Sequence, residues 1–121
     1  IAEVAAHYGI RVESIVHSGA ARAKQTADIL DTAIESSRGV SVRKGISPMD
    51  QVSLVAAKLD PESNLMLVGH LPFMERMTSY LIAGSVDKPV FKFQNSGIVC
   101  LDQDPETKYW IIIWTLMPHI S

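Results

Sequence analysis

Strand-type and helix-type segments alternate along most of the chain, and this alternation limits the fold more than any other feature. Short apolar, β-branched runs are typical of strands, whereas apolar residues at spacings of three and four are typical of helices. Strands are predicted at 11–18, 39–45 and 64–70, and helices at 1–9, 20–34, 47–60 and 71–84. This order predicts an α/β domain with a mainly parallel sheet and helices on both faces.

The final third of the chain carries a different pattern. Two strand-like runs, 96–102 and 108–117, are separated by a segment in which Asp104-Pro105 favours a turn. These two runs are therefore expected to form an antiparallel hairpin. The predicted fold class is three-layer α/β/α, with a mainly parallel sheet and a C-terminal antiparallel hairpin.

Helix boundaries are marked most clearly in the segments 47–60 and 71–84. Ser47 followed by Pro48 predicts an N-cap and a first helical position, so a helix is expected to begin there. Pro72 and Gly84 are expected to open and close the helix of 71–84. In the segment 20–34, helical spacing predicts one apolar face, made of Ala20, Ala23, Ala27, Leu30 and Ile34.

Composition excludes several classes of function. A chain of 121 residues has the size of one domain, and its net charge of −2 argues against a broad nucleic-acid surface. No apolar run approaches the roughly 20 residues that a membrane-spanning helix needs. The lone Cys100 is interpreted as a buried thiol, which fits a reducing, cytoplasmic setting. No metal-ligand spacing or glycine-rich phosphate loop is present, so neither a metal nor a cofactor is expected.

Polar side chains follow two of the predicted strands. Ser18 and Arg22 come just after the SIVH part (14–17) of the first predicted strand, and His70 ends the segment 64–70. An arginine in the first turn of a helix is disfavoured by the helix dipole by a few tenths to about 1 kcal/mol, unless an anion lies nearby. Arg22 and His70 together would suit a phosphoryl group. The alternatives are a solvated Arg22, a structural His70 and a helix-capping Ser18, and the capping role is preferred for Ser18.

Two segments resemble a known family. The stretch SGAARAKQTADIL (18–30) is similar to the Ser-Pro-x-x-Arg-Ala-x-Gln-Thr segment of the histidine phosphatase superfamily, with Gly19 in place of the proline. LMLVGHLPFMERMTSYL (65–81) resembles the second conserved block, a strand ending in Gly-His. The rest of the chain resembles the small SixA-type phosphohistidine phosphatases. This resemblance implies a phosphoglycerate mutase-like fold.

The resemblance also implies roles for individual residues. Arg22 would hold the phosphoryl oxygens, and His70 would bind an oxygen and stabilise the transition state, with Ser18 at the same phosphate. In the family, the nucleophilic histidine belongs to an Arg-His-Gly motif at the end of the first strand. Asp50 and Glu75 are candidates for the proton donor, although each is more simply interpreted as a surface helix residue.

Arg-His-Gly does not occur within residues 1–121. The other histidines, His7, His17 and His119, lack the expected context for the nucleophile. The segment 1–9 resembles the last turns of a helix. We therefore expect a single histidine phosphatase domain at 1–121 that lacks its first strand and the start of its first helix, and that is inactive alone.

The resemblance favours an enzyme that hydrolyses phosphohistidine on a phosphorylated protein. A phosphatase of the same superfamily that acts on small phosphate esters is an alternative. A non-catalytic phosphate-binding or interaction module is another, because only part of the pocket is present in residues 1–121.

Overall fold

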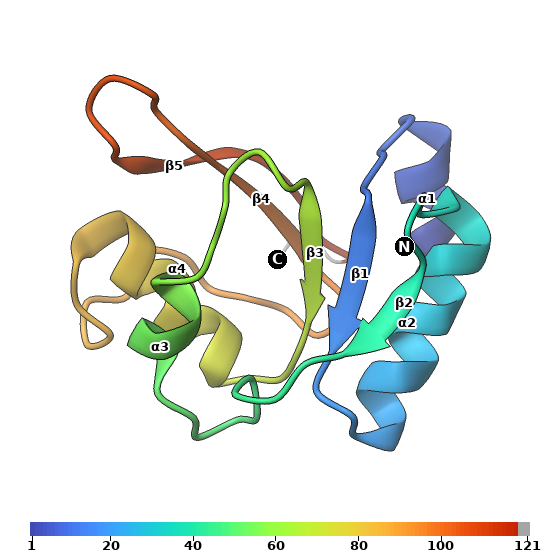
Figure 1. The fold of residues 1–121 in the computed structure, drawn as a ribbon, viewed down its shortest axis with the longest axis horizontal. Coiled ribbons are helices and arrows are strands. Elements are labelled where there is room, and N and C mark those ends of the chain that lie inside the picture. The colour runs from blue at the N-terminus through green and yellow to red at the C-terminus, as the bar shows by residue number, and fades with distance from the viewer. Residues whose placement is uncertain (119–121) are drawn as a thin grey trace.

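The computed structural model describes residues 1–118, so His119 lies outside the described residues. Helices and strands follow one another in the predicted order (Figure 1). They are α1 (Ala2–His7), β1 (Ser14–His17), α2 (Ala21–Ile34), β2 (Val40–Val42), α3 (Val52–Ala56), β3 (Leu65–Val68), α4 (Phe73–Ala83), β4 (Ile98–Gln103) and β5 (Trp110–Leu116).

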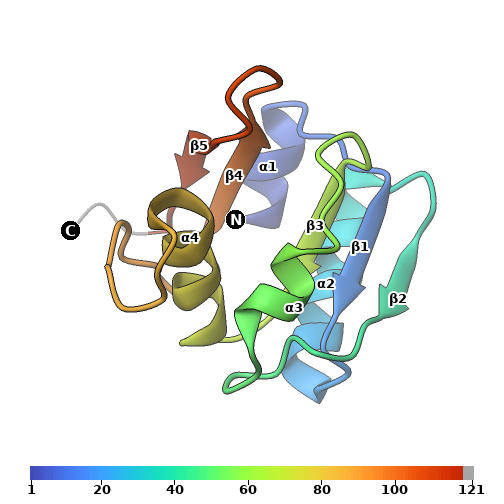
Figure 2. The same cartoon turned by 60° about the vertical axis from the view of Figure 1, so that its left-hand side comes forward.

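Strands β1, β2 and β3 form a parallel sheet in the order β2-β1-β3. Helices α1 and α2 pack on one face, where Val68 belongs to their apolar cluster. Helices α3 and α4 pack on the other face around Phe73, and Leu67 lies against this second cluster (Figure 2). Adjacent residues of β3 thus point to opposite apolar layers, as expected for a strand that is covered on both sides. The predicted three-layer α/β/α architecture is confirmed.

The predicted hairpin is also confirmed. Strands β4 and β5 are antiparallel, with Ile98 opposite Leu116 and Gln103 opposite Trp110. They form a two-stranded sheet of their own, separate from β2-β1-β3. The arrowheads in Figure 1 show that β4 runs in the opposite direction to β3.

The predicted start of the third helix is wrong. Helix α3 begins only at Val52, and its N-cap position is Gln51, which makes no side-chain capping bond. Ser47 instead belongs to a turn, in which its N–H donates to Asp50 Oδ2 at 2.9 Å and its carbonyl accepts from the Asp50 N–H at 3.0 Å. A short acidic side chain can satisfy nearby backbone groups in a turn as well as at a helix start, and here the turn is formed.

Helix α4 follows the prediction closely. It runs from Phe73 to Ala83, directly after Pro72. Gly84 ends the helix in the left-handed conformation with φ of 75° and donates its N–H to the Tyr80 carbonyl at 2.9 Å. Glycine suits this position because it has no Cβ to oppose a positive φ.

The turn between β4 and β5 depends on one carboxylate. Asp104 Oδ1 accepts the N–H groups of Thr107 at 3.0 Å and Glu106 at 2.8 Å, and these bonds lower the pKa of Asp104. Because the folded pKa lies below the unfolded one, the stabilisation exists above about pH 4 and is lost as the pH falls through the folded value.

We therefore expect the Thr107 amide resonance to titrate with a midpoint below about 3.9, the ordinary value for aspartate. An Asp104→Asn variant keeps an oxygen acceptor but has no charge to titrate, so this pH dependence should disappear. Amide chemical shifts between pH 2 and 6 provide the measurement. A midpoint at or above the ordinary aspartate value would contradict the assignment.

Candidate functional site

Strands β1 and β3 end side by side, because His17 pairs with Val68 in the parallel register. Ser18 directly follows β1, and His70 lies two residues beyond β3. Ser18 Oγ and His70 Nε2 are 2.6 Å apart in a hydrogen bond whose donor depends on the histidine tautomer. The bond joins residues 52 positions apart in the sequence. The fold thus brings together two of the residues that the sequence singled out.

Arg22 lies in the first turn of α2 and lines the same cavity as Gly69 and His70. Its side chain is exposed, and no carboxylate of residues 1–118 forms an ion pair with it. The nearby Lys24, in contrast, pairs with Asp28 at 2.9 Å. A guanidinium at the positive end of a helix, with no anionic partner, is suited to an anion that binds both the helix and the side chain.

The preferred capping role of Ser18 is not realised. The N-cap position of α2 is Ala20, and the helix has no side-chain capping bond. The Ala20 N–H lies 3.4 Å from Ser18 Oγ, which is long for a hydrogen bond, whereas the contact of Ser18 with His70 is short. The helix therefore begins without a side-chain acceptor for its first N–H groups.

The turn into α2 requires glycine. Gly19 has φ of 93°, a conformation that proline cannot adopt because its ring holds φ near −65°. His17 supports this turn, because its Nδ1 accepts the Gly19 N–H at 3.1 Å while its side chain is almost completely buried. His17 is therefore a structural residue, and sequence reasoning did not find this role.

The remaining candidates lie away from the cavity. His7 is exposed at the end of α1, where its ring meets the edge of the Tyr8 ring at a centroid distance of 5.6 Å. Asp50 is engaged in the turn with Ser47, and neither Asp50 nor Glu75 lines the cavity. The carboxylates that do line it are those of Glu3, Asp60 and Asp102. The sequence analysis did not single these out, since isolated acidic residues in loops or at strand edges produce no periodic signal.

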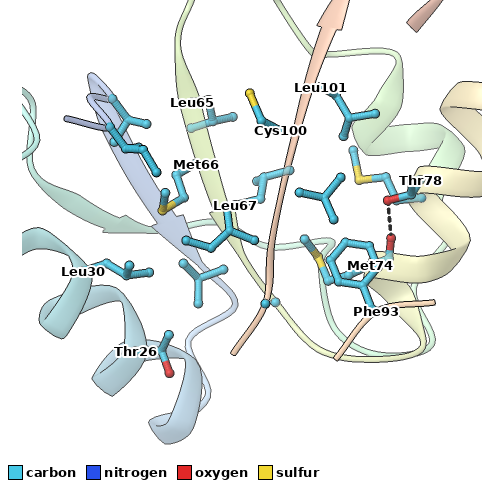
Figure 3. A pocket seen from close by; sticks show the side chains of 18 of the residues that line it. Thr26, Leu30, Leu65, Met66, Leu67, Met74, Thr78, Phe93, Cys100 and Leu101 are labelled. Carbon is cyan, nitrogen blue, oxygen red and sulfur yellow. Dashed lines mark hydrogen bonds between the residues drawn. The ribbon is translucent and has the colours of Figure 1, made fainter. Parts of the chain in front are cut away.

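A cavity of about 1310 Å³ lies between β3 and the hairpin. Figure 3 shows apolar side chains from both strands and from the flanking helices turned into it, among them Leu30, Leu67 and Leu101. Cys100 also lines the cavity, and burial, together with the nearby Asp102 charge, raises the pKa of its thiol. The phosphate candidates Arg22 and His70 line the same cavity.

Within residues 1–118, no group of three or more histidine, cysteine, aspartate or glutamate side chains could hold a metal ion. None of the helices in the same range is both long and apolar enough to cross a membrane.

Neither a protein-family model nor a curated protein matches the chain. Among solved structures, the histidine phosphatase SixA complexed with tungstate matches with a TM-score of 0.81 and 22% identity, covering 97% of this chain. The chain has the fold of the SixA phosphatases. A second match is a protein from Agrobacterium tumefaciens assigned to the SixA phosphohistidine phosphatases, with a TM-score of 0.73, 29% identity and 98% coverage of this chain.

The two SixA structures are longer than the part of them that this chain matches. The match covers 76% of the tungstate complex and 75% of the Agrobacterium protein, so those chains include further polypeptide. Within the shared part, this SixA-like chain places Ser18 and His70 in contact, and Arg22 in the cavity that His70 also lines.

Proposed function

We propose that this chain is the larger part of a phosphohistidine phosphatase, which hydrolyses a protein-borne phosphohistidine through a phosphohistidine enzyme intermediate. The observation that carries the proposal is the 2.6 Å contact between Ser18 and His70 at adjacent strand ends, with Arg22 lining the same cavity as His70. Ligands of open α/β sheets bind beyond the carboxyl ends of the strands, where these residues lie. The SixA-type fold supports the same conclusion.

Each residue has a defined role in this proposal. The Arg22 guanidinium donates two parallel hydrogen bonds to phosphoryl oxygens, and the N–H groups at the start of α2 face the same negative charge. His70 donates to another oxygen and stabilises the charge of the transition state. Ser18, which contacts His70 Nε2, holds that ring in place and offers its hydroxyl to the phosphate.

The nucleophile is supplied by an Arg-His-Gly motif outside residues 1–121. Its imidazole nitrogen attacks phosphorus as the bond from phosphorus to the substrate imidazole breaks, and that imidazole leaves with a proton. Water then attacks the phosphohistidine of the enzyme. The water oxygen binds phosphorus, the phosphorus–nitrogen bond breaks, and phosphate is released with the enzyme imidazole restored.

A non-catalytic phosphate-binding module is the second candidate. One observation favours it, namely that residues 1–121 contain no Arg-His-Gly. In that case Arg22, His70 and Ser18 would bind a phosphorylated partner without hydrolysing it.

The decisive experiment expresses the chain together with the codons that precede Ile1 in the same reading frame. Hydrolysis of a phosphohistidine peptide and of p-nitrophenyl phosphate is followed by ³¹P NMR and absorbance. We expect the peptide to be the faster substrate, with turnover lost in Arg22→Ala and His70→Ala but kept in Lys24→Ala. Residues 1–121 alone should show no turnover.

Other results would select the other candidates. Faster hydrolysis of the small ester would favour a small-molecule phosphomonoesterase, and phosphate binding without any turnover would favour the binding module. Hydrolysis by residues 1–121 alone that is abolished in His70→Ala would contradict a nucleophile outside these residues.

A further inference from the structure

The connection that follows β2 reaches the edge of the sheet at which Ser18 and His70 meet. Strand β2 is parallel to β1, and Val42 pairs with His17. One residue further along, the Arg43 N–H donates to the His17 carbonyl at 2.8 Å. Figure 1 shows that β1, β2 and β3 all end at this edge. Arg43 therefore lies beside Ser18, on the side of β1 that faces away from β3.

Arg43 and Lys44 together are named the basic flank of the site. Lys44 is exposed and Arg43 is half-buried, and neither forms an ion pair within residues 1–118. Neither lines the cavity that Arg22 and His70 line. The net charge of the whole chain is −2, so this pair of cations is a local feature rather than part of a generally basic surface.

Two carboxylates near this edge leave the basic flank charged. Asp50 lies in the same connection, but its carboxylate accepts the Ser47 N–H at 2.9 Å and forms no ion pair within the described part of the chain. Glu75 lies in α4, which follows β3 and is on the opposite side of the sheet from β2 (Figure 1). Positive charge thus lies on the β2 side of the phosphate candidates, outside their cavity.

We propose that the basic flank binds carboxylates of the phosphorylated protein, so that the preferred substrate carries acidic residues next to its phosphohistidine. This inference rests on the proposed function, which places the phosphoryl group at Arg22, Ser18 and His70. Arg43 and Lys44 lie outside the cavity, so they suit the residues around the phosphohistidine rather than the phosphoryl group.

The spacing of the strands agrees with this assignment. Neighbouring strands lie about 4.8 Å apart, so the end of β2 is displaced by that distance from the end of β1. An extended peptide advances about 3.3 Å per residue, and a carboxylate one or two residues from the phosphohistidine is displaced by about 3–7 Å. A guanidinium such as that of Arg43 can bind this carboxylate through two hydrogen bonds.

The test compares three peptides in which a triazolyl phosphonate, which is stable to hydrolysis, replaces the phosphohistidine. The two residues on each side of it are glutamates, glutamines or lysines. At low salt, residues 1–121 should bind the glutamate peptide at least threefold more tightly than the glutamine peptide, and the lysine peptide at least threefold more weakly. These differences should shrink at about 1 M salt, because screening then acts beyond about 3 Å.

Three variants locate the preference. Combining Arg43→Gln with Lys44→Gln should bring the affinities of the three peptides to within about twofold of one another, since the charges that distinguish them are removed. Arg22→Ala should instead weaken the binding of all three peptides. The matched control is Arg38→Gln, because Arg38 is exposed at the opposite end of β2, where its N–H donates to the Glu13 carbonyl at 2.7 Å. This control should retain the full preference for glutamate.

Equal binding of the three peptides by the unmodified chain would overturn the proposal, as would a preference that persists when both Arg43 and Lys44 are replaced. Undiminished binding of a glutamate peptide without the phosphonate would also overturn it, because acidic residues would then be recognised independently of phosphate. So would tighter binding of an oligonucleotide of the same net charge, because the flank would then be a nucleic-acid site.

Hydrolysis distinguishes failure of this inference from failure of the proposed function. A glutamate preference without hydrolysis by the longer chain would contradict the phosphatase and leave the basic flank as part of a phosphate-binding module. Hydrolysis with equal affinity for the three peptides would contradict the basic flank alone. Absence of binding by every peptide would contradict both proposals.

Discussion

Replacing Arg22 by alanine is expected to weaken the binding of inorganic phosphate to residues 1–121 by at least tenfold. Hydrogen bonds to charged groups contribute about 1.5–3 kcal/mol. A difference of about 1.4 kcal/mol corresponds to a factor of ten in affinity, so the expected loss is about 10-fold to 150-fold. Because no carboxylate of residues 1–118 pairs with Arg22, the substitution breaks no ion pair of the fold. The effect therefore reports on the anion alone.

Amide chemical-shift titrations with phosphate at constant ionic strength measure this affinity. The matched control is Lys24→Ala, which removes a cation from the same turn of α2 and should leave phosphate affinity unchanged. Arg22→Lys should retain part of the affinity, because an ammonium supplies the charge without the planar pair of donors. Equal affinity of Arg22→Ala and the unmodified chain would show that phosphate binds elsewhere.

Replacing Phe73 by alanine is expected to lower the free energy of unfolding by about 3–5 kcal/mol. Phe73 is 0% exposed and packs with Ile46, Val52 and Met77 between α3 and α4. Removing its ring leaves a cavity in addition to the lost apolar burial. Since small domains are stable by about 5–15 kcal/mol, the loss is a large fraction of the total.

Urea denaturation followed by circular dichroism provides the measurement for Phe73→Ala. Tyr109→Ala is the control, because Tyr109 is 72% exposed and its removal should change stability by less than about 0.5 kcal/mol. The substitution also bears on the site, since the Met74 N–H, one residue beyond Phe73, donates to the His70 carbonyl at 3.0 Å. A loss below about 1 kcal/mol for Phe73→Ala would contradict the assigned core.

Local periodicity predicted most of the fold. In α2, four of the residues placed at helical spacing are buried, namely Ala23, Ala27, Leu30 and Ile34. Ala20, placed on the same face, is the exposed N-cap residue instead. Interior positions were thus predictable because burial repeats with the helical period, whereas the end of the helix depends on the turn at Gly19.

The residues of the candidate site could be predicted from the sequence, but the contacts between them could not. Ser18, Arg22 and His70 could be singled out because each follows a strand. The preference of Ser18 for His70 over the start of α2 depends on a partner 52 residues away, and no local pattern specifies it. The helix start at Ser47 was also wrongly predicted, since a serine followed by proline fits both a helix start and a turn.

The separation of the two sheets has a mechanical consequence. Within the described chain, the hairpin of β4 and β5 shares no ladder with β3. Ile98 and Leu116 pack against the cluster of α1 and α2, and β5 also contacts α4. Apolar contacts tolerate small displacements, whereas a hydrogen-bonded ladder fixes the distance between its strands. The position of the hairpin relative to β3 therefore depends on side-chain packing rather than on backbone hydrogen bonds.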